Sequence, residues 1–192
     1  YTFLWLGICL LSSCYKLDLN PLSEATNANF YRNQTELELA VNDLYRVDFW
    51  GNDNELFTDN EWHRAQLTNA VIGGTMDAED ATVRNYWLVC YKAIARANSF
   101  MANKEKAAAN TPVDVLNRLT AEIRVIRAFQ YAKLVTHFGD VPFIEGVLTL
   151  EESYGKQRDS KAAITEFVYK ELDEAAQFLP DSYGTGAVQR LT

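Results

Sequence analysis

The longest regular pattern in the chain is a helical repeat of apolar side chains between positions 116 and 138. Its members recur every three or four residues, which is the spacing that gathers side chains on one face of an α-helix. They are Leu116, Leu119, Ile123, Ile126, Gln130, Leu134 and Phe138. Gly139-Asp140 follows with residues typical of turns. The pattern therefore predicts a long amphipathic helix that ends at this turn.

An earlier helix is predicted from Thr35 to about Trp50-Gly51. Thr35-x-x-Glu38 matches a capping box, and apolar residues follow it at helical spacing. The next stretch, residues 52–81, has no sustained period and contains Gly73-Gly74. We expect a long loop or short irregular helices there, and loops of that length in a compact domain are often functional.

Two further helices are predicted, one from Thr82 into residues 104–110 and one over residues 160–179, before Pro180. The side chains expected to face inward from the last helix are Ile164, Phe167, Val168, Leu172, Ala175, Ala176 and Leu179. Residues 141–144 form a short extended link, and no strand with clear alternation occurs in the sequence.

Helices of about 20 residues joined by short turns predict an all-α fold, either a bundle or an α-solenoid of helix pairs. Trp87-x2-Cys90-Tyr91-x2-Ile94 loosely resembles the first helix of a tetratricopeptide repeat. The helices do not recur at the steady interval of about 34 residues that such repeats have. An ordinary amphipathic core is therefore an equal alternative.

The first fourteen residues have the form of a bacterial lipoprotein signal. An apolar run leads into Leu11-Ser12-Ser13-Cys14, and it is too short to span a bilayer, which needs about 20 apolar residues. We expect residues 1–13 to be a signal peptide, truncated at its start, and Cys14 to carry the lipid anchor. The alternative is a buried N-terminal helix with an incidental cysteine, against which the polar sequence before Pro21 argues.

The formal net charge of −8 is unevenly distributed along the chain. Residues 15–80 hold thirteen acidic side chains against four basic ones, whereas residues 81–192 hold thirteen against fourteen. An acidic field repels phosphate backbones, so nucleic acid is not an expected partner.

Cys90 is the one cysteine after Cys14, so the sequence offers no disulfide framework and no zinc-binding spacing. Cys90 is predicted to be a small core residue.

The best candidate for ligand binding is an aromatic and acidic stretch at residues 48–62. Its candidate contact residues are Trp50, Asn52, Asp53, Asp59, Asn60 and Trp62. An aromatic face can pack on the apolar face of a sugar ring, and Asp and Asn side chains match hydroxyl groups. The alternative is that the aromatic residues only pin a long loop to the helices, with the acids solvated.

A second acidic cluster, Asp77, Glu79 and Asp80, lacks the spaced oxygen ligands and glycine of a calcium loop. Capping of the helix that begins near Thr82 explains these carboxylates better, so no metal site is predicted.

Arg124 and Arg127, with Glu122, are predicted to be structural. On a buried helix flank, an arginine can pair with a carboxylate and donate to loop carbonyls.

No catalytic arrangement is recognised in the sequence. Asp59 and Glu61 are spaced like many chance pairs in so acidic a region, and a glycosidase would need a defined separation of its two carboxyl groups. The two histidines, His63 and His137, lie in no Ser/His/Asp or Cys/His context. We therefore predict a binding protein without catalytic residues or a cofactor.

Several segments together resemble the N-terminal half of the SusD/RagB family of outer-membrane nutrient-binding lipoproteins. The blocks that carry the resemblance are Cys14 with Leu17-Asp18-Leu19-Asn20-Pro21, Trp87-x3-Tyr91-x2-Ile94-x3-Asn98, Ala121-Glu122-x-Arg124-x2-Arg127-Ala128-x2-Tyr131-x2-Leu134-x3-Phe138-Gly139-Asp140-Val141-Pro142, and Glu171-Leu172-x2-Ala175-x3-Leu179-Pro180. The third block is the most specific, since it joins a long helix pattern to a fixed turn. The four blocks occur in this order, and together they extend over nearly the whole chain.

The resemblance implies an all-helical fold in which tetratricopeptide-like pairs support irregular loops, with residues 14–192 as the N-terminal domain of a longer protein. It also implies a surface lipoprotein, held in the outer membrane through lipid on Cys14. Such a protein captures an oligosaccharide for a SusC-like TonB-dependent transporter. A peptide-binding nutrient receptor is the first alternative. The second is a helical module that docks the transporter without binding a ligand.

Overall fold

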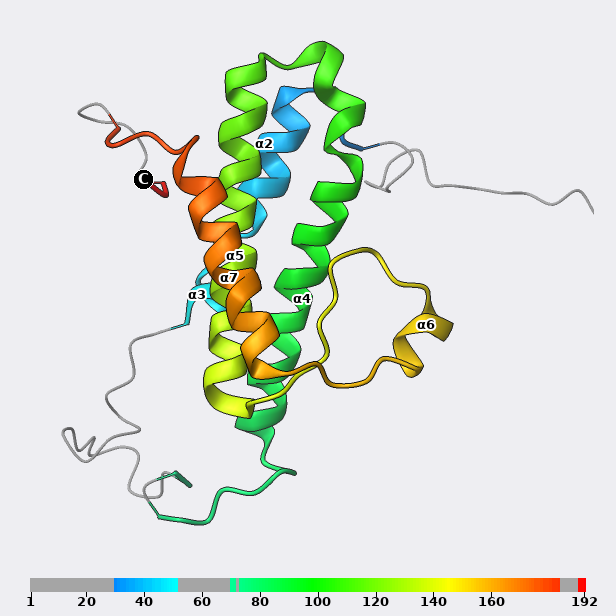
Figure 1. Cartoon of the computed structure of the whole chain (residues 1–192), viewed down its shortest axis with the longest axis vertical. Coiled ribbons are helices and arrows are strands. Elements are labelled where there is room, and N and C mark those ends of the chain that lie inside the picture. The colour runs from blue at the N-terminus through cyan, green and yellow to red at the C-terminus, as the bar shows by residue number, and fades with distance from the viewer. Residues whose placement is uncertain (1–29, 52–69, 72, 184–189) are drawn as a thin grey trace, which may run out of the picture. The chain divides into compact units, whose positions relative to one another are not determined.

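A computed structural model describes residues 30–51, 70–71, 73–183 and 190–192 of the chain. Its helices, in chain order, are α2 (Gln34–Asp43), α3 (Val47–Trp50), α4 (Ala81–Asn103), the 3₁₀ helix η2 (Lys104–Asn110), α5 (Val113–Phe138), α6 (Leu150–Tyr154) and α7 (Lys161–Ala176) (Figure 1). Within these residues the only strand-like pairing is one isolated bridge between Val141 and Asp159. The all-α prediction is confirmed.

Helix α5 is the element around which the described helices pack. It packs most extensively against α7 and α4, and α2 lies against it as well. Figure 1 shows α4 and α5 side by side in opposite directions, joined through η2, with α7 running back along α5. The predicted inward residues of α5 from Leu116 to Leu134 are all buried. The long apolar repeat thus lies at the centre of the helical layer.

One core cluster joins α4, α5 and α7. Its buried members are Cys90, Ile94, Ala128, Tyr131, Leu134, Val135, Val141, Ile164 and Val168. The prediction that Cys90 is a core residue is confirmed, and burial raises the pKa of its thiol to about 11. The cluster includes Val141, so the turn after α5 is packed into the core along with the helices.

The predicted end of the first helix at Trp50 is confirmed, but its start and its continuity are wrong. The helix is divided into α2 and α3, and α2 is capped by Asn33, two residues before Thr35. The Asn33 side chain accepts from the Glu36 amide at 3.0 Å, and the Glu36 carboxylate accepts from the Arg32 amide at 2.7 Å. Asparagine is among the preferred N-cap residues and ranks above threonine, so it sets the start of the helix.

The predicted inward face of the last helix is wrong at Leu172 and Ala176, which are exposed. Glu171 is buried in their place. The sequence pattern missed this position because an acidic residue is buried only where it has a partner, and its partners come from α5.

Helix α6 was also missed. It starts with a capping box between Thr149 and Glu152 inside a segment without an apolar period.

The corrected face of α7 gives a stability prediction. Ile164 is fully buried, whereas Leu172 is 39 % exposed on the same helix. We expect Ile164→Ala to lower the free energy of unfolding by about 2–5 kcal/mol, because it removes packed methyl groups and leaves a cavity. Leu172→Ala, the matched control, should cost less than about 1 kcal/mol. Urea unfolding measures both, and equal losses would contradict the assignment.

Candidate functional site

A buried carboxylate, Glu171 of α7, is held by two arginines of α5. Its Oε2 atom accepts from Arg127 Nε at 3.0 Å and from Arg127 Nη2 at 2.5 Å, and its Oε1 atom accepts from Arg124 Nη1 at 2.6 Å. The Glu171 and Arg127 side chains are only 4 % and 6 % exposed. Two charge-assisted bonds from one guanidinium converge on the same carboxylate oxygen, and they hold the two side chains against each other. This pair therefore sets how α7 lies on α5.

Asn98 of α4 extends the ion pair toward the loop after α5. Arg127 Nη1 donates to Asn98 Oδ1 at 2.9 Å, and Asn98 Nδ2 donates to the carbonyls of Ile144 and Gly146 at 2.8 and 3.2 Å. One hydrogen-bonded chain thus runs from α7 through α5 and α4 to residues 144–146. We call this chain, from Glu171 through Arg127 and Asn98 to the two carbonyls, the buried relay.

The segment that the buried relay reaches, residues 141–159, is fastened at both of its ends. Val141 and Asp159 exchange backbone hydrogen bonds of 3.2 and 2.9 Å. The Tyr131 hydroxyl accepts from the Ile144 amide at 2.7 Å and donates to the Ile144 carbonyl at 2.9 Å. The Phe143 amide donates to the Asp159 carboxylate at 2.9 Å and holds the pKa of that carboxyl below its usual range. We call this segment the 141–159 loop.

A second buried carboxylate, Glu122, organises a separate network. It accepts from the Tyr45 hydroxyl at 2.7 Å, from Arg118 at 2.7 Å and from Arg190 at 2.9 Å. The Leu191 amide donates to the same Tyr45 hydroxyl at 3.1 Å. The network ties Arg190 and Leu191 to α5 and to Tyr45, and Arg190 Nη1 also donates to Asn42 Oδ1 of α2 at 2.8 Å.

The structural role predicted for Arg124 and Arg127 is confirmed, with different partners. Both arginines bind Glu171, and Glu122 binds Arg118 and Arg190 instead. The loop carbonyls accept from Asn98, whereas the arginines were expected to donate to them. Asn98 and Glu171 are both positions in the sequence blocks that resemble the SusD/RagB family. This was the sequence signal that could have placed them in one arrangement, which the structure forms through Arg127.

Trp50 is the one predicted ligand residue among the described residues. Its indole N–H donates to the Leu44 carbonyl at 3.1 Å, and its ring stacks on Phe129 with centroids 5.0 Å apart. These are the contacts expected of the alternative in which it pins the chain to the helices. Asn52, Asp53, Asp59, Asn60, Trp62 and the predicted lipid anchor Cys14 lie outside the described residues. The ligand assignment of all six residues from Trp50 to Trp62 stays a prediction.

The backbone at Phe49, near the start of the 48–62 stretch, is anchored to α5. The Phe49 carbonyl accepts from Gln130 Nε2 at 2.8 Å and from Lys133 Nζ at 3.1 Å. The Lys133 ammonium also lies over the Tyr86 ring, 5.0 Å from its centroid. The chain at Phe49 is therefore held to α5 by Gln130 and Lys133.

In the acidic cluster before α4, the Asp77 and Asp80 carboxylates each accept a hydrogen bond from the backbone amide two residues later. Asp80 is the N-cap, and its side chain accepts from the Thr82 amide at 2.7 Å, which lowers its pKa. Asp77 accepts from the Glu79 amide at 2.9 Å. Helix capping, the predicted role, is thus confirmed for Asp80. Across the described part of the chain, no three His, Cys, Asp or Glu side chains are grouped as metal ligands would be.

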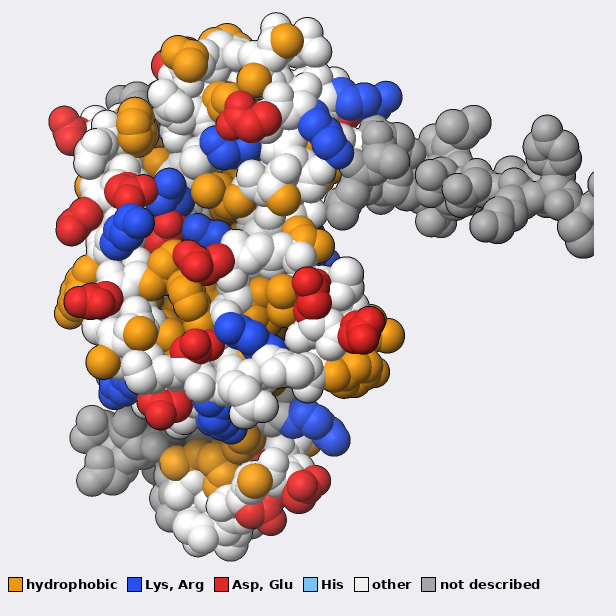
Figure 2. Space-filling view, turned by 45° about the vertical axis from the view of Figure 1, so that its right-hand side comes forward, with side chains coloured by type: hydrophobic (Ala, Val, Ile, Leu, Met, Phe, Trp, Pro, Cys, Tyr) orange, Lys and Arg blue, Asp and Glu red, His pale blue; other side chains and the backbone are white. Residues whose placement is uncertain are grey.

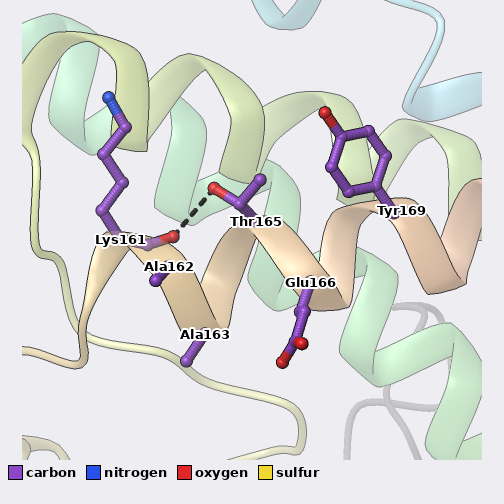
Figure 3. A pocket seen from close by; sticks show the side chains of 6 residues that line it. All are labelled: Lys161, Ala162, Ala163, Thr165, Glu166 and Tyr169. Atoms are coloured by element: carbon purple, nitrogen blue, oxygen red, sulfur yellow. Dashed lines mark hydrogen bonds between the residues drawn. The ribbon is translucent and has the colours of Figure 1, made fainter.

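An open hollow lies on the outer side of α7, lined by Lys161, Ala162, Ala163, Thr165, Glu166 and Tyr169 (Figure 3). All six residues belong to this one helix. The Thr165 hydroxyl donates to the Lys161 carbonyl one turn earlier, at 2.8 Å. Figure 3 shows Lys161, Thr165 and Tyr169 along one side of the helix. The hollow brings together no nucleophile and base, and we assign it no chemistry.

Comparison with protein families gives a match over residues 17–192 to the SusD-like family described as "Starch-binding associating with outer membrane". The chain belongs to this SusD-like family. A relative from Formosa agariphila, SusD-like protein P2, is 26 % identical over 194 residues, and the match covers 94 % of this chain and 38 % of that protein. SusD-like protein P25 from the same organism is 24 % identical. The chain thus spans little more than a third of these relatives.

Solved SusD-like structures share the fold. A SusD-like carbohydrate-binding protein from Bacteroides fragilis aligns with a TM-score of 0.70 and 29 % identity, covering 79 % of this chain and 33 % of that one. A second SusD-like protein from that organism gives a TM-score of 0.73 at 25 % identity. A laminarin-binding SusD-like protein gives 0.69 at 23 % identity. The predicted tetratricopeptide-like, SusD-like helical fold is confirmed. None of the helices described is long and apolar enough to cross a membrane.

The buried relay predicts unequal effects for two glutamates that bind the same arginine. Glu171→Gln should lower the free energy of unfolding by about 3–5 kcal/mol, because it leaves Arg127 buried without a counter-charge. Glu174 also contacts Arg124 at 2.6 Å but is 38 % exposed, so Glu174→Gln should cost no more than about 1 kcal/mol. Denaturant unfolding measures both, and similar losses would contradict the relay.

The lowered pKa of Asp159 gives a pH prediction. A carboxyl whose pKa is lower in the folded protein than its ordinary 3.8 adds stability above that value and loses it as the pH falls through the folded-state pKa. We expect the protein to be more stable than its Asp159→Asn variant at pH 7 and the difference to shrink at about pH 3. Urea unfolding at both pH values tests this, and a difference independent of pH would contradict it.

Proposed function

We propose that this protein is a glycan-binding lipoprotein of the outer membrane that captures an oligosaccharide and delivers it to a SusC-like TonB-dependent transporter. It binds its ligand without catalysing a reaction. The family match over residues 17–192 is the observation that carries this proposal, since the family is described as starch-binding and associated with the outer membrane. The Bacteroides fragilis relative named as a carbohydrate-binding protein, at 29 % identity, supports the same ligand class.

Residues 48–62 are the proposed ligand surface within this chain. Trp50, Asn52, Asp53, Asp59, Asn60 and Trp62 combine aromatic faces with short carboxylates and amides, the groups that suit a sugar's apolar face and its hydroxyls. The anchoring of Phe49 by Gln130 and Lys133 supports the proposal, because it limits the freedom of the chain entering this stretch.

The proposed attachment to the membrane is lipid on Cys14, after removal of residues 1–13, with the protein on the cell surface. Residues 14–192 are then the N-terminal part of a protein as long as the relatives, of which this chain matches 38 %. In this proposal, the part of the protein that follows residue 192 also contributes ligand contacts. The transporter is the proposed recipient of the sugar.

Calorimetric titration tests the proposal directly. The whole protein, made without lipid from Tyr15 onward, is titrated with oligosaccharides of starch and of laminarin, and with cationic peptides. We expect saturable sugar binding that Trp62→Ala weakens by roughly 1 kcal/mol or more, about fivefold, because an aromatic contact is lost.

Tyr154→Ala is the matched control, because Tyr154 is an exposed aromatic residue outside the proposed ligand surface. It should leave sugar affinity unchanged. Sugar binding that Trp62→Ala does not weaken would remove the ligand role of this stretch. Binding of peptides alone would overturn the glycan proposal.

A further inference from the structure

We draw no further inference here: the strongest candidate, the surface patch of exposed apolar side chains on and beside α6 (Figure 2), formed by Val147, Leu150 and Tyr154, carries none because nothing in the described part of the structure shows what covers it.

Discussion

The hydrogen-bonded ion pair between Arg127 and Glu171 is the interaction on which the described structure most depends. It joins α5 to α7 in the interior, and through Asn98 it also reaches α4 and the carbonyls of Ile144 and Gly146. A buried charge is costly unless it is paired and fully hydrogen-bonded. The arrangement therefore holds only when three helices and one loop are all in place, which gives the fold specificity beyond that of apolar packing.

Polar side chains of the helical layer fix the segments that leave it. Apolar contacts along α5 hold the helices together, but they do not determine where the loops leave them. Polar side chains do so at two places, Asn98 and Tyr131 for the 141–159 loop and Gln130 and Lys133 for the chain before Gly51. In this SusD-like chain, the helices therefore determine where the 141–159 loop and the chain at Phe49 lie.

The sequence alone predicted what depends on local periodicity. The apolar repeat of α5 and its end at Gly139, the start of α4 near Thr82 and the core position of Cys90 were all recognisable, because helical spacing and turn residues are local signals. The burial of Glu171 was not, since it depends on arginines more than forty positions away. The cap at Asn33 was missed because Thr35-x-x-Glu38 offered a competing pattern. Of the candidate site, only Trp50 lies in the described structure, where its contacts are with Leu44 and Phe129.

Hydrogen exchange in an Asn98→Leu variant tests the central claim most directly, because the substitution keeps the side-chain volume and removes all three bonds of Asn98. If the buried relay holds the loop on the helices, the amides of Val141, Phe143, Ile144 and Asp159 should exchange at least tenfold faster. The α2 amides, which the relay does not touch, should keep their protection. Unchanged exchange in the 141–159 loop, or an equal acceleration throughout α2 and the loop, would contradict the account.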